Sequence, residues 1–466
     1  MGYLEQAELQ GGFENESSKL ASEIPFEPSK VPEIINDESR FSLFSQEAIS
    51  IAQKILNGEK PSQSQAELEA LIGEKVGSEL KRQIPLAKRQ EMGAFFTGVS
   101  LREKAFSYLD SPYSVLDPAC GAGDLLLSYA NKLPIRDSLE ETLISWEDFI
   151  YGFELEESFL RMARARLVIL AYLKGLKNWC KSALSLNNIF RNIVLGDALA
   201  TAEWPKTEHI VLNPPYIYMK AEEKCPWTTG SVSAAAVFID HCLKKGSHAS
   251  VITAILPDVL RTGSRYRRWR ELVGKSRLIK RTQVHGAFDS QVDVDVFILE
   301  LHLRPFQIGH LQHQWTCQLK VTDKTVKDLF SVTVGSVVPH RDREEGMECV
   351  YIHPKDAPPW GEITTPPGHR KYFGATHQAP FVVIRRTSSP SDKNRAIGTV
   401  VNCEGNIAIE NHLIILKPLS KKLSDCWRLL EVLKLKSTSE WLNDRIRCRH
   451  LTVSAIKDLP WAEQKP

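Results

Sequence analysis

The stretch that decides the fold is YSVLDPACGAGDLL, which occupies residues 113–126. A short apolar run ends at Asp117, a loop of small residues follows, and an apolar helical pattern begins near Leu125. Strand, loop and helix in this order are typical of the first unit of an open α/β sheet, where ligands bind beyond the carboxyl ends of the strands. Gly121 and Gly123 would let the backbone approach a ligand closely, because neither carries a Cβ. A Gly-x-Gly pair also occurs in ordinary tight turns, so the loop alone leaves both interpretations open.

Alternating strand and helix patterns extend this unit into a larger sheet. Short apolar runs lie between longer helical ones, with strands expected at 114–116, 149–153, 193–195, 209–212, 249–255 and 294–302. This alternation predicts an α/β fold with a mostly parallel, Rossmann-like sheet. Before it, apolar residues at helical spacing between 45 and 86 predict a small helical subdomain, and after about residue 304 the pattern becomes mixed and strand-rich. We therefore expect three domains, with bounds at 1–84, 85–305 and 306–466.

The composition is that of an ordinary soluble protein. Hydrophobic residues make up 42% of the 466 residues and charged residues 25%, and the net charge of +2 neither requires nor excludes a polyanionic partner. The N-terminus has no basic segment followed by an apolar run, and no apolar stretch is long enough to cross a bilayer, so we expect a cytoplasmic protein without membrane contact. The nine cysteines include no Cys-x-x-Cys pair, and His310 and His313 have no third ligand at sensible spacing, so we expect no metal.

Acidic residues follow two further strands. Glu154 ends the run IYGFE, and Asp197 follows the strand at 193–195 and Gly196. A carboxylate at such a strand end can accept the hydroxyls of a ribose, and Asp197 could accept a hydrogen bond from an adenine amino group. Each alone is equally well a solvated carboxylate, but with Asp117 three consecutive strand ends are acidic, which favours a nucleoside site. The glycine loop lacks the third glycine of the dinucleotide fingerprint and any Gly-Lys-Ser/Thr, so nucleotide phosphates are not favoured.

A fourth strand, at 209–212, runs into Asn213-Pro214-Pro215-Tyr216. The prolines stiffen the loop and have no N–H, so local carbonyls are left as acceptors. An asparagine oxygen and a proline carbonyl can together hold both hydrogens of one NH2 group and draw its nitrogen toward tetrahedral geometry, so that its lone pair can attack a methyl group. Positioning supplies most of what this transfer needs when the methyl is already activated. Tyr216 offers a flat face on which the base can stack. The alternative is that Asn-Pro-Pro-Tyr has no catalytic role and simply forms a rigid turn.

These motifs, in this order, resemble those of the gamma-class N6-adenine DNA methyltransferases of restriction–modification systems. The resemblance covers about residues 85–305 and rests on GAFFT at 93–97, DPACGAG at 117–123, Glu154, Gly196-Asp197 and NPPY at 213–216. It implies a Rossmann-like class I methyltransferase sheet, S-adenosyl-L-methionine as the cofactor, and N6 of a flipped-out adenine in DNA as the methyl acceptor. The catalytic residues would be Asn213, Pro214, Tyr216 and Phe288, and the cofactor-binding residues Thr97, Asp117, Gly121, Gly123, Glu154 and Asp197.

Two of these assignments depend on looser parts of the resemblance. In the family a threonine before the glycine loop serves the methionine carboxylate, and Thr97 holds that position, although Gly98 stands where the family usually has proline. The loop-then-strand segment 286–297 resembles the family region whose aromatic residue packs on the opposite face of the extruded adenine. Phe288 is the candidate there, and a core residue tucked under the following strand is the equal alternative.

The resemblance also implies double-stranded DNA as the partner. A basic run from Arg261 to Arg281 would neutralise phosphates near the site, or it forms the solvated face of a helix. Residues 306–466 would be the target-recognition domain, and the segments 381–387 and 451–460 look similar to such domains. A separate restriction endonuclease is a candidate partner, since we find no convincing nuclease motif in this chain.

Three other functions stay open at this point. The Asn-Pro-Pro-Tyr loop also serves enzymes that methylate RNA bases or a protein glutamine amide, but those typically have a simpler glycine loop and no large domain after the catalytic one. A non-catalytic specificity subunit would be expected to have a degraded loop, whereas Asn213 and Tyr216 are intact. A single-chain enzyme that also cuts DNA would need a nuclease domain, for which little length remains.

Overall fold

The computed structural model describes the chain from residue 40 to residue 461 with several gaps, namely residues 40–73, 75–84, 89, 97–107, 112–175, 183–222, 225–289, 292–303, 313, 315–316, 324–447 and 449–461. The predicted N-terminal tail, His310 and the first four residues of GAFFT lie outside these residues. No helix in the described ranges is both long and apolar enough to cross a membrane.

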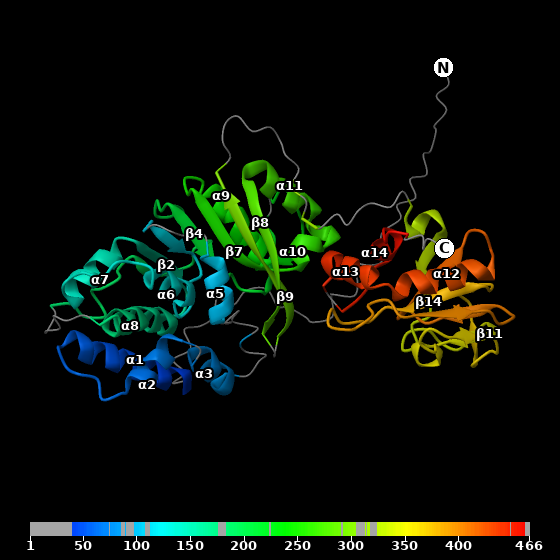
Figure 1. Cartoon of the computed structure of the whole chain (residues 1–466), viewed down its shortest axis with the longest axis horizontal. Helices are drawn as coiled ribbons and strands as arrows, with labels where there is room; N and C mark the ends of the chain where they lie inside the picture. Colours follow the sequence, from blue (N-terminus) through cyan, green and yellow to red (C-terminus); the bar gives the residue numbers. More distant parts are fainter. Residues whose placement is uncertain are drawn as a thin grey trace, which may run out of the picture. The chain divides into compact units, whose positions relative to one another are not determined.

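A seven-stranded sheet forms the centre of the fold (Figure 1). Its strand order is β3 (Ile193–Leu195), β2 (Ile150–Glu154), β1 (Val115–Asp117), β4 (His209–Leu212), β7 (Val251–Pro257), β9 (Val292–His302) and β8 (Leu278–Asp289). The first five strands are mutually parallel, and β9 runs antiparallel to both β7 and β8. The mostly parallel α/β sheet predicted from the sequence is therefore confirmed.

Helices bury both faces of this sheet, which is why its inner strands are continuous apolar runs. Every residue of β4 and β7 is buried. Successive residues point to opposite faces: Val211 packs in one core cluster, whereas Ile210 and Leu212 pack in the other. Helices on the first side are α5 (Val99–Ala105), α6 (Asp124–Ala130), α7 (Leu139–Glu147) and α8 (Glu157–Leu173). Those on the second side are α9 (Ala234–Lys244), α10 (Val259–Thr262) and α11 (Arg267–Ser276).

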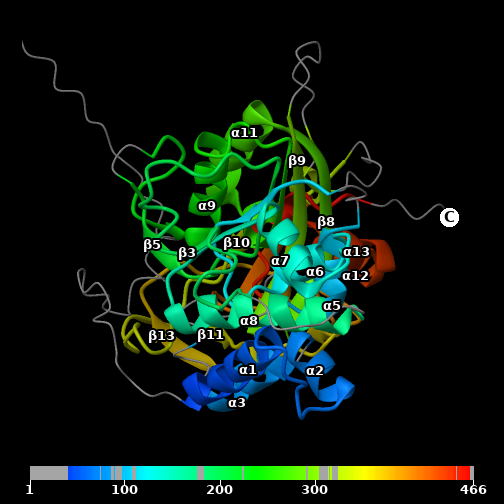
Figure 2. The ribbon, with the colours of Figure 1, turned by 90° about the vertical axis from the view of Figure 1, so that its left-hand side faces the viewer.

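The helical pattern before the sheet forms three helices, α1 (Arg40–Leu56), α2 (Gln65–Ile72) and α3 (Lys75–Gln83). Ser64 caps α2 in a reciprocal capping box with Glu67, so two backbone donors at the start of this helix are satisfied. The three helices lie beside α8, as Figures 1 and 2 both show.

Strand β8 corrects one expectation. The sequence predicts a loop at 286 before the last strand, but β8 runs for twelve residues through Gly286 and includes Phe288. The pairing of β8 with β9 shifts register around Gly286, which adopts a φ of 101°. The bulge explains the error, because an irregular, polar strand does not alternate cleanly between apolar and polar residues.

The chain after 323 is mixed α/β, as predicted. One sheet has the order β10 (Phe330–Val334), β17 (Leu413–Pro418), β14 (Phe381–Arg385), β15 (Gly398–Val401) and β12 (Glu362–Ile363). A second has β13 (His369–Tyr372), β11 (Met347–Ile352) and β16 (Ile407–Ile409). The helices are α12 (Leu423–Lys434), α13 (Lys436–Arg445) and α14 (Val453–Lys457). Segment 381–387 begins with buried β14, and 451–460 contains α14.

Candidate active site

Four neighbouring parallel strands end in polar residues at one edge of the sheet. In the spatial order β3, β2, β1 and β4, the residues at or just after the strand ends are Asp197, Glu154, Asp117 and Asn213. Carboxyl ends of parallel strands meet at one edge, which is where open α/β sheets bind ligands. Residues spread over almost a hundred positions of sequence are thus brought together as the motifs predicted.

The glycine loop uses backbone conformations that favour glycine. Gly121 and Gly123 have φ values of 54° and 83°. A Cβ added to Gly123 would lie only 2.9 Å from the Cβ of Ala163 on α8. The loop is therefore packed directly against that helix at Gly123, and the positive φ values favour glycine at both positions.

Glu154 holds the glycine loop in place. Its Oε2 accepts the Gly121 N–H at 2.7 Å, while its Oε1 accepts the N–H groups of Leu155 and Glu156, each at 2.9 Å. Burial raises the pKa of Glu154, and these backbone donors oppose that rise. A carboxylate has about four acceptor sites, so roughly one is left for a ligand hydroxyl. For Glu154 to accept both ribose hydroxyls, as expected from the sequence, one of its three hydrogen bonds from backbone N–H groups would have to break.

Asp117 and Asp197 have opposite environments. Asp117 is buried and accepts the Ala119 N–H at 3.0 Å, and desolvation raises its pKa to about 8. Asp197 is exposed, and its Oδ1 accepts the Leu199 N–H at 2.8 Å. Asp197 is therefore the more accessible of the two to a ligand, whereas Asp117 primarily shapes the loop that follows β1.

The Asn-Pro-Pro-Tyr loop is tied to Thr97 and to β7. The Asn213 Nδ2 donates to Thr97 Oγ1 at 2.9 Å, and the Tyr216 hydroxyl donates to Asn213 Oδ1 at 2.7 Å and lies 3.2 Å from the Ile255 carbonyl. Pro214 is buried beside them. With its nitrogen on Thr97, the Asn213 amide has a fixed orientation, and its oxygen keeps a second lone pair for another donor.

Phe288 lies next to Tyr216, but the two rings do not form parallel walls. Their centroids are 5.5 Å apart and their planes meet at 75°, an edge-to-face contact. Phe288 is half-buried and packs against the core, so the core role that the sequence left open is at least part of its function. A base stacked between parallel rings would require one of them to turn.

Three buried charges behind the site, Asp124, Arg166 and Arg102, belong to no sequence motif. The carboxylate of Asp124 accepts the Thr97 N–H at 2.9 Å and pairs with Arg166 at 2.9 Å and with Arg102 at 3.3 Å. Arg166 also donates to the Ala122 carbonyl at 2.6 Å. Its guanidinium further donates to three carbonyls at the C-terminal end of α2, those of Leu71, Ile72 and Gly73. The sequence does not single out Arg166, because helix α8 also carries Arg161 and Arg164.

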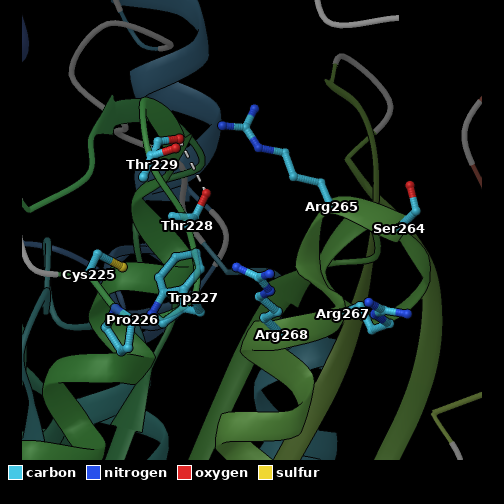
Figure 3. Close-up of a pocket in the computed structure, with 9 residues that line it drawn as sticks. All are labelled: Cys225, Pro226, Trp227, Thr228, Thr229, Ser264, Arg265, Arg267 and Arg268. Carbon is cyan, nitrogen blue, oxygen red and sulfur yellow. Dashed lines mark hydrogen bonds between the residues drawn. The ribbon is translucent and has the colours of Figure 1, made fainter. Parts of the chain in front are cut away.

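The predicted basic run divides into buried and exposed arginines. Arg261 is buried and pairs with Asp258 at 2.7 Å, and Arg277 is buried against the Ala249 carbonyl at 2.6 Å. Three exposed members, Arg265, Arg267 and Arg268, line a pocket of about 420 Å³ between α11 and the loop after β5 (Tyr218–Lys220), shown in Figure 3. Its lining comprises Cys225, Pro226, Trp227, Thr228, Thr229, Ser264, Arg265, Arg267 and Arg268.

No group of three histidine, cysteine, aspartate or glutamate side chains is placed to share a metal ion within the described ranges. The residues predicted to act in catalysis and cofactor binding thus form a site built from carboxylates, an amide, a hydroxyl and glycine backbone.

Comparison with known proteins gives one family match and several similar structures. Residues 82–287 match the family described as N-6 DNA Methylase. No curated protein sequence matches the chain. This region, which holds every residue assigned above except Phe288, is therefore similar to N6 DNA methyltransferases.

Among solved structures, the Type IIL restriction-modification enzyme MmeI in complex with DNA is 12% identical, with a TM-score of 0.50 over 90% of this chain and 70% of that one. The type I restriction-modification system methyltransferase subunit from Streptococcus thermophilus is 16% identical, with a TM-score of 0.33 over 46% of this chain and 45% of that one. At these identities the likeness to MmeI shows the fold. The predicted fold class, a Rossmann-like class I methyltransferase sheet followed by a mixed α/β domain, is confirmed.

Proposed function

We propose that this chain is a site-specific DNA methyltransferase that transfers a methyl group from S-adenosyl-L-methionine to N6 of an adenine flipped out of DNA. It would act as the modification component of a restriction–modification system. The observation that carries this proposal is the Asn213 amide, held by Thr97 and Tyr216 at the end of β4, beside three acidic strand ends. The N-6 DNA Methylase match over 82–287 supports the same class.

The residues present fit the cofactor. S-adenosyl-L-methionine carries a nucleoside and a methyl group on a sulfonium, so the methyl needs no further activation. The glycine loop follows β1 at the edge where open α/β sheets bind ligands, and Gly121 has no Cβ to keep a ligand from its backbone. Exposed Asp197 can accept from an adenine amino group and Glu154 from a ribose hydroxyl. Thr97 would face the methionine end, where its hydroxyl can also donate.

Asn213 and Pro214 would orient the target amino group. The second lone pair of Asn213 Oδ1 and the Pro214 carbonyl would each accept one N6 hydrogen. Bound S-adenosyl-L-methionine would supply the methyl group, with the carbon–sulfur electron pair staying on sulfur. Asn213 and Pro214 would hold the N6 nitrogen that takes this methyl, and one of the two N6 protons would leave to solvent. Because the amide orientation is fixed by Thr97, little reorganisation is needed, and positioning supplies the catalysis.

An adenine reaches this site only after leaving the duplex, which costs a few kcal/mol. Stacking on Tyr216 would return about 1–3 kcal/mol, and phosphate contacts would provide the rest. Residues 306–466 would form the target-recognition domain that chooses the sequence, double-stranded DNA would be the partner, and a separate endonuclease would share the target.

The decisive experiment measures methyl transfer from radiolabelled S-adenosyl-L-methionine to unmethylated duplex DNA, with RNA and bulk protein as parallel acceptors. Label in N6-methyladenine is the expected result. Label in RNA or in a protein glutamine would instead favour the alternative methyltransferases, and no label in any acceptor would favour a non-catalytic subunit.

An Asn213→Ala variant separates chemistry from binding. It should abolish transfer while cofactor binding, measured by calorimetry, survives. Asp197→Ala is the counterpart, and it should weaken cofactor binding, because this exposed carboxylate has no role in the buried core. If the Asn213→Ala variant kept near-normal turnover, the Asn-Pro-Pro-Tyr loop would not have the catalytic role proposed for it.

A further inference from the structure

Most of the basic run 261–281 is occupied by the protein itself. Arg261 is held by Asp258 and, at 3.2 Å, by Asp444. Arg270 donates to the carbonyls of Leu260 at 3.0 Å and Gly263 at 2.8 Å. Arg277 likewise donates to three backbone carbonyls. These arginines stabilise the second face of the sheet, so sequence density alone overstates the charge offered to a ligand.

Two of the remaining arginines face the pocket of Figure 3. The guanidinium group of Arg268, in the first turn of α11, extends toward Trp227, and that of Arg265, just before α11, extends toward the side of the two threonines, whereas Arg267 points away from them. Arg267 lies 3.8 Å from Glu271 on its own helix. Arg268 has no ion-pair partner in the part of the chain that the structure describes, and none of the nine lining residues is acidic.

The pocket also offers neutral donors. Thr228 and Thr229 carry hydroxyls on the wall opposite the arginines. Trp227 is 3% exposed, and its indole Nε1 is a buried donor with no hydrogen-bond partner among the described residues. Arg268 lies in the first turn of the ten-residue helix α11 and Arg265 in the short 3-10 helix (Ser264–Tyr266) just before it, where the dipole of α11 favours a negative charge. Cations, hydroxyls and a helix N-terminus together are suited to an anion with several acceptor oxygens.

The pocket is rigidly connected to the Asn-Pro-Pro-Tyr loop. Strand β5 begins two residues after Tyr216 and pairs with β6 (Ser231–Ser233), and the pocket wall is the loop between these strands. The Ser233 N–H donates to the Tyr266 hydroxyl at 3.2 Å, and Arg265 donates to the Ser231 carbonyl, so both walls are joined.

We propose that this pocket binds one phosphate of the DNA backbone near the flipped adenine, with Arg265 and Arg268 as its cationic ligands. This inference rests on the proposed function, because that function identifies DNA as the molecule whose phosphate enters the pocket. It would fix the register of the DNA strand relative to Asn213 without reading any base, since phosphate contacts position the duplex and base contacts specify the sequence.

The test compares Arg265→Ala, Arg268→Ala and the double variant with Lys275→Ala. Lys275 is an exposed cation on the same helix outside the pocket, so it controls for loss of charge. DNA affinity is measured by fluorescence anisotropy over a range of salt, on target and scrambled duplexes. Pocket variants should bind both duplexes about tenfold more weakly. In a plot of log K against the logarithm of the salt concentration, the slope for the pocket variants should be about 0.9 less steep than for the wild type. The double variant should show the same reduction and no more, because both arginines would bind one phosphate.

The outcomes separate this inference from the proposed function. If the wild-type chain makes N6-methyladenine in DNA but the pocket variants match Lys275→Ala in slope and affinity, the phosphate site is wrong and the function stands. A wild-type chain that neither binds nor methylates DNA overturns both. A slope change seen with RNA but not with DNA overturns the DNA phosphate as the occupant. All these variants should bind the cofactor as tightly as the wild type. A loss of cofactor affinity would indicate misfolding of the β5–β6 wall. Circular dichroism and an Arg268→Lys variant would identify such misfolding.

Discussion

Gly123→Ala tests whether the glycine loop is set by its packing against α8. The residue has a φ of 83°, and the new Cβ would lie 2.9 Å from the Ala163 Cβ and 3.2 Å from its Cα. The left-handed backbone costs an L-residue about 1–2 kcal/mol. Forcing an extra methyl into a packed interface costs about 1–3 kcal/mol more. We therefore expect a loss of roughly 2–5 kcal/mol in the free energy of unfolding, together with weaker cofactor binding because the loop must shift.

Gly196→Ala is the matched control. Gly196 follows the end of β3 in the same edge of the sheet, its φ is not in the left-handed region, and an added Cβ meets no atom within 4 Å. Urea unfolding of both variants would be followed by fluorescence and circular dichroism, with the midpoint compared at constant slope. A Gly123→Ala protein as stable as Gly196→Ala would refute the packing argument.

A second substitution identifies the colliding group itself. Ala163→Gly removes the methyl that the new side chain would meet, at a cost of about 1 kcal/mol for a glycine inside α8. In the double variant the backbone of α8 still lies 3.2 Å from the new methyl, so the rescue should be partial, with a coupling of about 0.5–3 kcal/mol. Strictly additive losses would mean that packing against α8 does not limit the loop.

Three further predictions concern stability. Gly98→Pro should stabilise the protein by about 0.4–1 kcal/mol, because the φ of −59° suits proline and a Cβ there meets no atom within 4 Å; a lower melting temperature would contradict this. Arg166→Met should cost about 3–5 kcal/mol, because buried Asp124 loses the shorter of its two ion pairs and buried carbonyls such as that of Ala122 lose their donor, whereas Arg82→Met, in an exposed pair with Glu79, should change the free energy of unfolding by less than about 1 kcal/mol; equal losses in urea would refute the role of the buried network. Burial raises the pKa of Asp117 from 3.8 to about 8, so its stabilising contribution is full below pH 3.8 and is lost as the pH rises through about 8. The melting temperature of Asp117→Asn should therefore fall less than that of the wild type between pH 5 and 8, and parallel curves would exclude Asp117 as the cause.

The strand ends were predictable because each is a local pattern. The glycine loop after Asp117, the acids Glu154 and Asp197, and Asn-Pro-Pro-Tyr are all recognised in short segments. Each of the four follows a strand, so the alternating topology places them at one edge of a parallel sheet. Their approximate assembly follows from strand order alone. The hydrogen bond from Asn213 to Thr97, between residues 116 positions apart, requires the tertiary structure.

The parts that sequence reasoning missed depend on distant partners. Asp124 is the one charge in helix α6 and Arg166 is one of three arginines in α8, and nothing local shows that these two are buried against each other. The basic run is uniform in sequence, yet Arg261 and Arg268 differ entirely in burial. Strand β8 was missed where a bulge at Gly286 interrupts the alternation. In each case the deciding information lies in a neighbour that is far away in the chain.

The carbonyls of Leu71, Ile72 and Gly73 that Arg166 binds bear on modular recombination of such proteins. A chimera joined near residue 84 would exchange the small helices for those of another protein, although their last turn completes the coordination of a buried guanidinium. That guanidinium also serves Asp124, which in turn holds the backbone of Thr97. Any functional junction therefore has to lie before α2 or to carry a compatible partner for Arg166, so the helices and the sheet are inherited as one piece.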